Sequence, residues 1–488
     1  MLSRSCCVVA LAAVTMSCSD AESATEPKGG MKLEFSSCTL LTDPAHAPAG
    51  AEFEGIASAT AECATTTAPA VWNDPERGSI DLFVKRYPAA SQPAKAQIWM
   101  LQGGPGFSGM GYEPLVYEMA KSIPDFDFYI PDHRGTGKSS FATEETQNLD
   151  GLTATDGAKD VAALIDAARV PSQQVFVFGA SYGAYWAQRY LQVRPDQATA
   201  TILDSAVPAV DYAFAHWDEQ FDAAARTVLA LCQADATCSA KLGPDPVAKG
   251  FEALAAAEAQ TCPTFIRRIT FGAFLMSGYF RRMLLPASIY RMLRCDAADQ
   301  TWFERVGQYL TTPGYPDPGH SAVVNKNITY SELWSTDMTA DQIRAAENAL
   351  LAINGSAVWA DLEPSWPKYP HDEYYGSWPS TAQPVLVLQG TLDPRTPYGD
   401  LLKPHYAAPN QYYVELPLAN HGLLARESAP MVDPGADACG WQVMRSFLAD
   451  PSKPPDTSCI TGMAPLDFGK PPAEFLAAVG IQDLWENP

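Results

Sequence analysis

The stretch FGASYGA, residues 178–184, decides the fold because it places a serine on a tight turn between two regular elements. Residues 174–178 (QVFVF) form an apolar, extended run, and residues 184–192 (AYWAQRYLQ) have helical character. In the pattern G-x-S-x-G, the turn from strand to helix exposes the serine hydroxyl above the sheet edge and places a backbone N–H at a helix N-terminus. The glycines permit the turn because a Cβ at either position would clash. A small-residue turn between two core elements could carry the same letters by chance, but the flanking strand and helix favour a nucleophile at Ser181.

Strand-like runs recur on both sides of this turn. They are residues 79–85 (SIDLFVK), 97–101 (QIWML), 126–130 (FDFYI), 201–204 (TILD), 384–389 (PVLVLQ) and 411–416 (QYYVEL). Residues 155–169 have the pattern of an amphipathic helix, with Val161, Leu164 and Ile165 on one face. Short, mostly apolar strands that alternate with helices predict an α/β fold, with a mostly parallel central sheet and helices on both of its faces.

The region from residue 207 to residue 376 has few strand signals and many alanine-rich helical stretches, such as 217–231 and 341–353. We interpret it as a helical lid inserted between two strands of the sheet. The predicted organisation has five parts: a signal peptide (1–17), a polar tether (18–34), the first part of the α/β core (35–206), the helical lid (207–376) and the C-terminal part of the core (377–488).

The length of 488 residues is too great for one small core and fits a large enzyme domain with an insertion, or two domains. The chain has 33 basic and 56 acidic residues, and its net charge is −23. This balance argues against nucleic acid or an anionic membrane as a partner, because the negative charges of either would repel the protein. The charge does not identify a substrate, and nothing in the sequence indicates an oligomeric state.

The first residues have the composition of an export signal. Arg4 provides a positive charge, and residues 8–14 (VVALAAV) are apolar but too short to span a bilayer. Residues 14–18 (VTMSC) resemble the cleavage box of a bacterial lipoprotein, with Thr15 where leucine is usual. We therefore expect an exported protein: a lipidated Cys18 would hold it to a membrane in the periplasm or cell envelope, and otherwise an ordinary signal peptidase would release it. No later segment is long and apolar enough to cross a membrane.

Eight cysteines follow this leader: Cys38, Cys63, Cys232, Cys238, Cys262, Cys295, Cys439 and Cys459. An even number of cysteines in an exported chain predicts disulfides. Local spacing favours the pairs Cys38–Cys63, Cys232–Cys238 and Cys439–Cys459, which leaves Cys262–Cys295, although spacing alone does not fix the connectivity. No cysteine or histidine group has the spacing of a zinc site, so we expect no metal.

Two loops after late strands carry the partners that a nucleophilic serine needs. Residues 390–397 (GTLDPRTP) follow the run PVLVLQ, and residues 417–422 (PLANHG) follow QYYVEL. The serine hydroxyl needs a base, and the imidazole needs a carboxylate that fixes its tautomer and stabilises the imidazolium. Because the carboxyl ends of parallel strands meet at one edge, we predict a triad of Ser181, Asp393 and His421, in the order that an α/β-hydrolase sheet carries it.

Other residues compete for two of these roles. The seven histidines are His46, His133, His216, His320, His371, His405 and His421. Taken singly, each is more simply explained as a surface or core histidine, but only His421 follows a late strand and precedes glycine. Asp204 also ends a strand, but it precedes the lid, and its simpler role is to brace a loop, so Asp393 is the preferred carboxylate.

A tetrahedral intermediate also needs an oxyanion hole. Residues 101–107 (LQGGPGF) end the strand QIWML, and their glycines let backbone N–H groups approach a substrate oxygen. We assign one donor to Gly104 and the other to the N–H of Tyr182. Residues 135–139 (GTGKS) look like the end of a phosphate-binding loop, but the earlier glycine of that motif is missing.

These motifs together resemble one known family. GGPGFSG (103–109), PDHRGTGKSS (131–140) and GASYGAY (179–185), with the loops of the predicted acid and base, resemble the prolyl aminopeptidase and tripeptidyl aminopeptidase family of α/β-hydrolases. The resemblance extends from about residue 38 to residue 459, and the cysteine pattern is most similar to the secreted tripeptidyl-aminopeptidase branch. Two positions depart from the family pattern: Gln102 stands where prolyl aminopeptidases have histidine, and His133 stands where glutamine is common.

The resemblance implies an exported serine exopeptidase that acts on peptides with a free amino terminus through an acyl-enzyme, without a cofactor. It also implies that an acidic group holds the substrate amine, for which Glu219 and Glu113 are candidates, with Asp218 beside them; an acidic helix face is the simpler explanation of each. The alternative function is an esterase or lipase on small esters. A binding protein without enzymatic activity is a third, and the complete triad argues against it.

Overall fold

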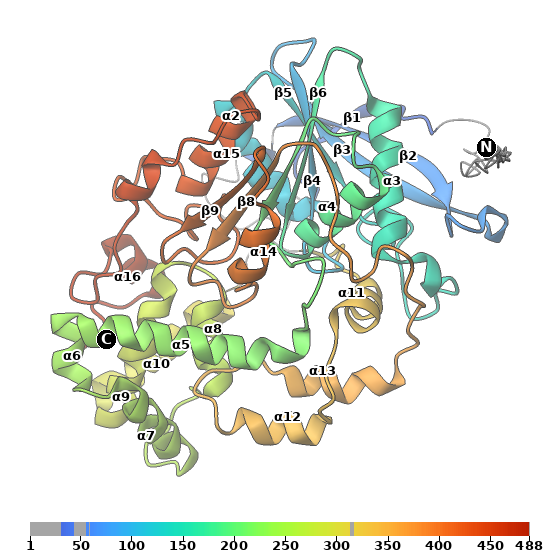
Figure 1. Cartoon of the computed structure of the whole chain (residues 1–488). Helices are drawn as coiled ribbons and strands as arrows, with labels where there is room; N and C mark the ends of the chain where they lie inside the picture. Colours follow the sequence, from blue (N-terminus) through green and yellow to red (C-terminus); the bar gives the residue numbers. More distant parts are fainter. Residues whose placement is uncertain (1–30, 43–54, 58, 313–316, 488) are drawn as a thin grey trace, which may run out of the picture.

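The computed structural model describes residues 31–42, 55–57, 59–312 and 317–487 (Figure 1). The expected signal peptide, the lipidation site Cys18 and most of the tether lie outside these residues. Within them, no helix combines the length and the apolar character that a membrane crossing requires.

The strands that the structure describes form one nine-stranded sheet in the order β1-β2-β3-β5-β4-β6-β7-β8-β9. Their bounds are β1 Ser36–Thr39, β2 Thr60–Pro69, β3 Ser79–Tyr87, β4 Ala96–Leu101, β5 Phe126–Pro131, β6 Gln174–Ala180, β7 Ala200–Asp204, β8 Val385–Gly390 and β9 Gln411–Leu416. The pairs from β5 to β9 are parallel, and the three pairs from β1 to β5 are antiparallel. The predicted α/β fold is confirmed, and each predicted strand is present.

The parallel strands lie in the centre because both of their faces are apolar. Every residue of β4, β5, β7 and β8 is buried. Strand β2 (TAECATTTAP) pairs with β1 and β3, and only its residues Ala61, Ala64 and Ala68 are buried, so its sequence lacks the apolar signature of a central strand.

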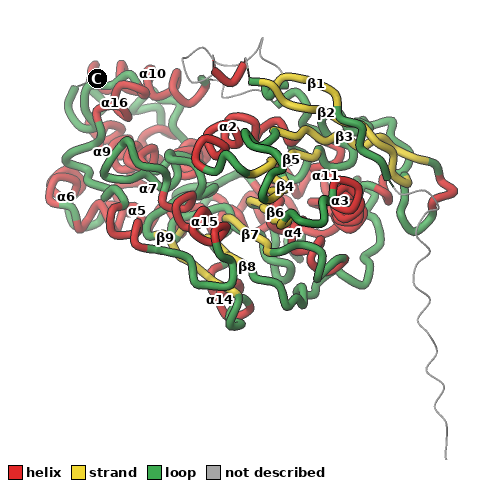
Figure 2. Tube along the Cα trace, turned by 90° about the horizontal axis from the view of Figure 1, so that it is seen from above, coloured by secondary structure: helices red, strands yellow, loops and turns green. Residues whose placement is uncertain are grey.

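Helices cover both faces of the sheet (Figure 2). On one face α3 (Ala154–Ala168) packs beside α4 (Tyr182–Val193), and Val161, Leu164 and Ile165 of α3 are buried there as predicted. On the other face α2 (Glu113–Ser122) and α15 (Cys439–Ala449) pack against β4, β5 and β6. The short helix α14 (Gly399–His405) connects β8 to β9.

The chain between β7 and β8 is helical and lies below the sheet in Figure 1. Its helices are α5 Trp217–Ala234, α6 Ala236–Leu242, α7 Pro246–Glu258, α8 Arg268–Met276, α9 Leu284–Arg294, α10 Ala297–Thr311, α11 Ala322–Ile328, α12 Ala340–Glu347 and α13 Ser356–Leu362. This agrees in character with a helical insertion, whose bounds at residues 207 and 376 stay a prediction.

The end of the chain packs with these helices rather than with the sheet. Phe468, Leu484 and Trp485 belong to the apolar cluster of α5–α10, together with residues of α16 (Ala473–Val479). The guanidinium of Arg291 on α9 donates to the carbonyl of Leu484 at 2.9 Å. The sequence placed this segment with the C-terminal part of the core, because its apolar residues do not reveal which surface they cover.

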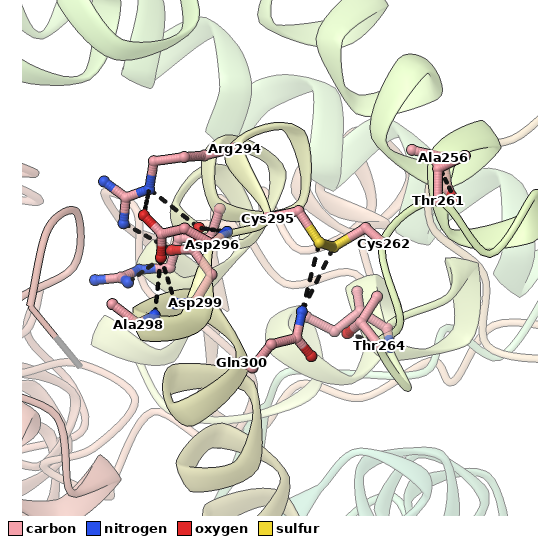
Figure 3. The surroundings of a disulfide bond; sticks show 12 residues. Ala256, Thr261, Cys262, Thr264, Arg294, Cys295, Asp296, Ala298, Asp299 and Gln300 are labelled. Carbon is pink, nitrogen blue, oxygen red and sulfur yellow. Dashed lines mark hydrogen bonds and ion pairs between the residues drawn. A yellow bond between two sulfur atoms is a disulfide. The ribbon is translucent and has the colours of Figure 1, made fainter.

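Four disulfides join the eight cysteines in the pairs that spacing favoured: Cys38–Cys63, Cys232–Cys238, Cys262–Cys295 and Cys439–Cys459. The third connects the segment after α7 to the end of α9, where Gln300 Nε2 lies 3.4 Å from the Cys295 sulfur (Figure 3). Disulfides in this number are typical of proteins that fold in an oxidising compartment, which agrees with export.

Candidate active site

The predicted catalytic residues follow neighbouring parallel strands at the same edge of the sheet. In the register of these strands Ala180 pairs with Asp204, Asp204 with Leu388, and Gly390 with Leu416. The residues that come directly after these positions therefore meet at one place. The loops of Ser181, Asp393 and His421 all begin there.

Ser181 occupies the turn between β6 and α4 with φ 59° and ψ −126°, a conformation that a residue with a side chain rarely adopts. Two glycines permit the turn. A Cβ on Gly179 would lie 2.0 Å from the carbonyl oxygen of Gly183, and a Cβ on Gly183 would lie 2.0 Å from the carbonyl oxygen of Leu101. The turn therefore has the backbone geometry that the predicted nucleophile elbow requires.

The structure brings the predicted acid and base together. His421 Nδ1 lies 2.7 Å from Asp393 Oδ2, and the Asp393 carboxylate also accepts from the hydroxyl of Thr396 at 2.7 Å and from the N–H of Arg395 at 2.9 Å. Burial by itself would raise the pKa of Asp393, but the imidazole and these hydrogen bonds outweigh it and lower that pKa. His421 Nε2 is buried and makes no hydrogen bond within the described residues, so it is available to take a proton.

The end of β7 holds the three loops in place relative to one another. The Ser181 N–H donates to the carbonyl of Asp204 at 2.9 Å. The hydroxyl of Thr396, three residues after Asp393, donates to the carbonyl of Ser205 at 2.9 Å. The N–H of Gly422, directly after the base, donates to the hydroxyl oxygen of Ser205 at 2.9 Å. We call Asp204 and Ser205 the β7 corner.

The Asp204 carboxylate belongs to this corner and not to the imidazole. It is 1% exposed and accepts the N–H of Leu423 at 2.9 Å and the hydroxyl of Ser205 at 2.9 Å. Burial raises the pKa of Asp204 to about 6. Asp204 therefore braces the loop of the base, while Asp393 makes the direct contact with His421.

The glycine-rich loop after β4 lies against the nucleophile. A Cβ on Gly103 would lie 3.3 Å from Ser181 Cβ, and the Gly103 N–H is already bound by the side-chain oxygen of Gln102 at 2.8 Å. Gly104 has φ 118°, and a Cβ there would lie 2.8 Å from the N of Gly106. Tyr182 is the first residue of α4, so its N–H has no acceptor within the helix. Because the N–H of Gly103 is already bound, the backbone N–H groups of Gly104 and Tyr182 stay the predicted donors of the oxyanion hole.

Both departures from the family pattern have local partners. His133 is buried, and its Nδ1 donates to the carbonyl of Arg134 at 2.9 Å while its Nε2 accepts from the hydroxyl of Tyr182 at 3.3 Å. Burial lowers the pKa of His133 to about 4, so that the ring is neutral and can accept. Gln102 holds Gly103, as described above. Gln102 therefore holds the backbone of Gly103 in the loop beside Ser181, and His133 holds the side chain of Tyr182, the residue directly after Ser181.

Glu113 does not fit the role of a substrate-binding acid. It is 1% exposed, its Oε1 lies 2.5 Å from the ammonium of Lys85, and it accepts the N–H of Thr42 at 2.7 Å. The sequence did not reveal this pairing because Lys85 lies on β3, 28 residues before Glu113 at the start of α2. Asp218 is also structural, since its carboxylate accepts backbone N–H groups at the start of α13.

Glu219 remains accessible on the first turn of α5. Its side chain is 52% exposed and lies beside the imidazole of His216, with 3.9 Å between Oε2 and Nδ1. Within the described residues it makes no contact with the predicted triad. Its role in binding an amine stays a prediction.

A buried acidic residue that the sequence did not single out lies near the elbow helix. Glu332, in the π-helical turn η7 (Thr329–Leu333), accepts from the hydroxyls of Tyr185 at 2.6 Å and Tyr369 at 2.5 Å, and forms an ion pair with Arg189 at 2.8 Å. No motif marks it, because its partners come from distant segments. Within the same described ranges, no group of three or more His, Cys, Asp or Glu side chains could hold a metal ion.

Two family models match the chain. The model of the α/β-hydrolase fold matches residues 98–239, which include the predicted nucleophile, and the model described as TAP-like protein matches residues 356–459, which include the predicted acid and base. No curated protein matches the chain at a significant level.

Solved structures with the same fold have low sequence identity to this chain. A proline iminopeptidase of Mycobacterium smegmatis is 17% identical, with a TM-score of 0.36 over 73% of this chain and 91% of its own. An esterase of Thermogutta terrifontis is 15% identical, with a TM-score of 0.34 over 77% and 96%. A monoacylglycerol lipase of Paleococcus ferrophilus is 14% identical, with a TM-score of 0.32 over 70% and 91%. At these values the likenesses do not distinguish a peptidase from an esterase or a lipase.

Proposed function

The chain belongs to the tripeptidyl-aminopeptidase-like family of α/β-hydrolases, and from this premise we propose that it is an exported serine peptidase that releases short N-terminal pieces from peptides. The family makes it a hydrolase. The proposal of a serine peptidase is supported most directly by the contact between His421 and Asp393, with 2.7 Å between Nδ1 and Oδ2. This pair lies at the sheet edge where β6 ends in the strained turn of Ser181.

The chemistry follows from the roles of these atoms. His421 Nε2 takes the proton of the Ser181 hydroxyl as the oxygen attacks the carbonyl carbon of the scissile peptide bond. The imidazolium, held by Asp393, then gives that proton to the leaving amine, and an acyl-enzyme remains. Water, activated by the same imidazole, hydrolyses the ester and restores the serine. No step needs a cofactor.

The negative charge that develops on the substrate oxygen needs donors that are already in place. We assign them to the N–H groups of Gly104 and Tyr182. Two hydrogen bonds hold the loop of Gly104 in place. The side chain of Asn325 on α11 donates to the carbonyl of Pro105 at 2.6 Å, and the N–H of Ser321 donates to the carbonyl of Gly106 at 2.9 Å.

The preference for a free amino terminus is proposed from the family and not from a contact. Glu113 is buried, and Glu332 is already compensated by Arg189, so neither offers an uncompensated charge to an amine. Glu219 is the acidic candidate that stays accessible.

Replacement of Ser181 by alanine tests the nucleophile. We expect turnover to fall by roughly a thousandfold or more, because the remaining site can only bind and polarise the substrate. The exposed Ser452→Ala serves as the matched control and should keep wild-type turnover. Wild-type turnover in the Ser181 variant would overturn the assignment.

A substrate panel tests the class of reaction. We expect tripeptide anilides with a free amino terminus to be cleaved faster than the same anilides with a blocked amino terminus, and faster than small esters of similar size. Preference for blocked peptides, or hydrolysis of esters alone, would replace the aminopeptidase proposal by an esterase or lipase.

A further inference from the structure

Three arginine side chains lie beside the predicted base and acid with fewer acceptors than they have donors. Arg281 and Arg282 are in the 3₁₀ turn η6 (Phe280–Met283), between α8 and α9 of the inserted helices. Arg395 follows Asp393 by two residues in the loop after β8, and its backbone N–H binds that carboxylate.

Arg282 is the most unusual of the three. It is 1% exposed, and its Nη1 donates to the carbonyl of Leu418, three residues before the base, at 2.7 Å. Its Nε and Nη2 are buried and have no hydrogen-bond partner in the part of the chain that the structure describes. Its guanidinium lies 5.2 Å from the centre of the Tyr279 ring. Burial lowers the pKa of Arg282 to about 10, which leaves the group charged at neutral pH.

The other deeply buried arginines of the described residues all have a carboxylate. Arg134 pairs with Asp160 at 2.6 Å, Arg189 with Glu332 at 2.8 Å, and Arg291 with Asp299 at 3.0 Å. A buried charge without a counter-charge is costly, and proteins normally avoid it. Arg282 departs from this rule, and it does so next to the catalytic loop.

Arg281 and Arg395 bring two more positive charges to the same place. Arg281 is half-buried, its Nη1 donates to the Ser277 hydroxyl at 3.2 Å, and its Nε is buried without a partner among the described residues. The side chain of Arg395 is half-buried and makes no hydrogen bond or ion pair within those residues. The two guanidinium groups oppose each other electrostatically.

The acidic groups near these arginines compensate them only in part. The carboxylate of Asp393 attracts Arg282 and Arg395 electrostatically, but it is hydrogen-bonded to the imidazole of His421 and forms no ion pair with either arginine within the described residues. The exposed Glu427 interacts with Arg281 in the same way and forms no ion pair with it within 4.0 Å. Arg281 and Glu427 also line a groove of about 690 Å³ between η6, the loop after the base and the C-terminal segment. The whole chain has a net charge of −23, so three arginine side chains at one place that form no ion pair with any described residue are unexpected. They indicate that a ligand of negative charge binds there.

We propose that Arg281, Arg282 and Arg395 form a subsite for a carboxylate on the leaving side of the scissile peptide bond. This inference rests on the proposed peptidase function. The imidazole of His421 must reach the leaving amine to protonate it, so the leaving part of the peptide lies beside the loop that Arg282 holds. Arg395 and Arg281 present donors to the carboxylate, and Arg282 adds charge from beneath the loop.

The carboxylate can have two sources. It is either the free C-terminus of a short peptide or the side chain of an acidic residue directly after the cleaved bond. Both present the same two oxygens, which suit the forked donors of a guanidinium. The substrates of the enzyme are therefore short or acidic peptides rather than long neutral chains.

Four substrates test the subsite in the wild-type protein. All share the acyl group Ala-Ala-Ala with a free amino terminus, and they differ only in the leaving group. The leaving groups are alanine with a free carboxylate, alanine amide, aspartic acid amide and a neutral anilide. We expect the first, the third or both to exceed alanine amide by roughly tenfold or more in kcat/KM, the size of a charge-assisted contact. A gain for free alanine alone identifies the C-terminus, and a gain for aspartic acid amide identifies the side chain. Equal kcat/KM for all three peptides would overturn the proposal.

Arg395→Gln and Arg281→Gln assign the effect to these side chains. Each should reduce kcat/KM for the carboxylate substrates more than for the anilide, so that the ratio between them falls by roughly tenfold. The control Arg445→Gln removes a charge on α15 that already pairs with Asp437 at 3.1 Å, and it should keep the wild-type ratio. A wild-type ratio in both Arg395→Gln and Arg281→Gln would overturn the assignment.

A binding measurement separates failure of the subsite from failure of the peptidase function. In the Ser181→Ala protein, calorimetry compares the tetrapeptide Ala-Ala-Ala-Ala with its C-terminal amide and with Ala-Ala-Ala-Asp amide. Tighter binding of at least one carboxylate peptide, lost when Arg395→Gln is added, supports the subsite even if the anilide is not hydrolysed. Anilide hydrolysis together with equal binding of the three peptides would remove the subsite and leave the peptidase function standing.

Discussion

The replacement Asp204→Asn is expected to raise the unfolding free energy at neutral pH relative to wild type. It is also expected to reduce the catalytic turnover that depends on His421. Asp204 is 1% exposed at the β7 corner, and burial raises the pKa of its carboxyl from 3.8 to about 6. A carboxyl whose pKa is higher in the folded state contributes stability that is present below the unfolded pKa and is lost as the pH rises through the folded pKa.

The size of this loss follows from the two pKa values of Asp204. The difference between 3.8 and about 6 corresponds to about 3 kcal/mol of unfolding free energy that the ionised carboxylate costs the folded protein at neutral pH. Asparagine has nearly the same shape, can still accept the N–H of Leu423, and carries no charge. The difference in unfolding free energy between variant and wild type should therefore shift in favour of the variant by about 2.5 kcal/mol between pH 4 and pH 7.5.

The same change should alter catalysis in the opposite sense. The groups that interact with the Asp204 carboxylate include the imidazole of His421, the carboxylate of Asp393 and the phenol of Tyr112. The negative charge of Asp204 interacts favourably with the imidazolium that forms in the transition state, so its removal should lower the turnover number.

Two measurements check this prediction. Equilibrium unfolding in guanidinium chloride, with the disulfides intact, gives the stability at pH 4, 6 and 7.5, and anilide hydrolysis at pH 7.5 gives the turnover number. Asp156→Asn is the matched control: burial also raises the pKa of Asp156 to about 6, but its charged neighbours are Arg134, Asp160 and Lys159 rather than the predicted triad. It should show the stability effect and keep the wild-type turnover number. Stability curves that stay parallel for Asp204→Asn and wild type, or an unchanged turnover number in Asp204→Asn, would refute the reasoning.

Two further changes test the surroundings of the site. Gly103→Ala places a Cβ 3.3 Å from Ser181 Cβ and 3.1 Å from the Ala180 carbonyl oxygen. We expect kcat to fall by roughly tenfold or more, with little change in far-UV circular dichroism. An unchanged kcat would show that the loop can shift freely. Glu332→Gln leaves the buried Arg189 without its closest counter-charge and should lower the unfolding free energy by about 3 kcal/mol in a thermal or denaturant titration. The control Glu219→Gln, on the exposed face of α5, should leave the unfolding free energy nearly unchanged. Equal effects of the two variants would contradict the structural role of Glu332.

The parts of the fold that the sequence predicted are those whose information is local. The strand, the turn and the helix around Ser181 are adjacent in the chain, so one short stretch specifies all three. Asp393 and His421 could be placed because each lies in the loop that follows a strand-like run, and parallel strands bring their carboxyl ends together. The family models confirm the fold and the family that these motifs indicated.

The parts that the sequence did not predict depend on partners far apart in the chain. Glu113 looked like a surface acid of α2, but Lys85 on β3 makes it a buried ion pair. Trp485 and its neighbours near the C-terminus looked like part of the core, but the apolar surface that they cover belongs to the inserted helices. In each case the residue type showed that burial or charge needed a partner, and only the three-dimensional contacts showed which one.

The charges around His421 have opposite effects on the reaction. The carboxylates of Asp393 and Asp204 interact favourably with an imidazolium, whereas Arg282 and Arg395, whose charges act on Asp393, bring positive charge close to the same ring. A carboxylate bound in the proposed arginine subsite would compensate the arginines and remove most of their effect, since it is the uncompensated charge that acts on the ring. The imidazolium would then form more readily when a carboxylate substrate is bound than when a neutral one is. The preference for carboxylate substrates should therefore appear in kcat and not only in KM, because part of the interaction is gained in the transition state.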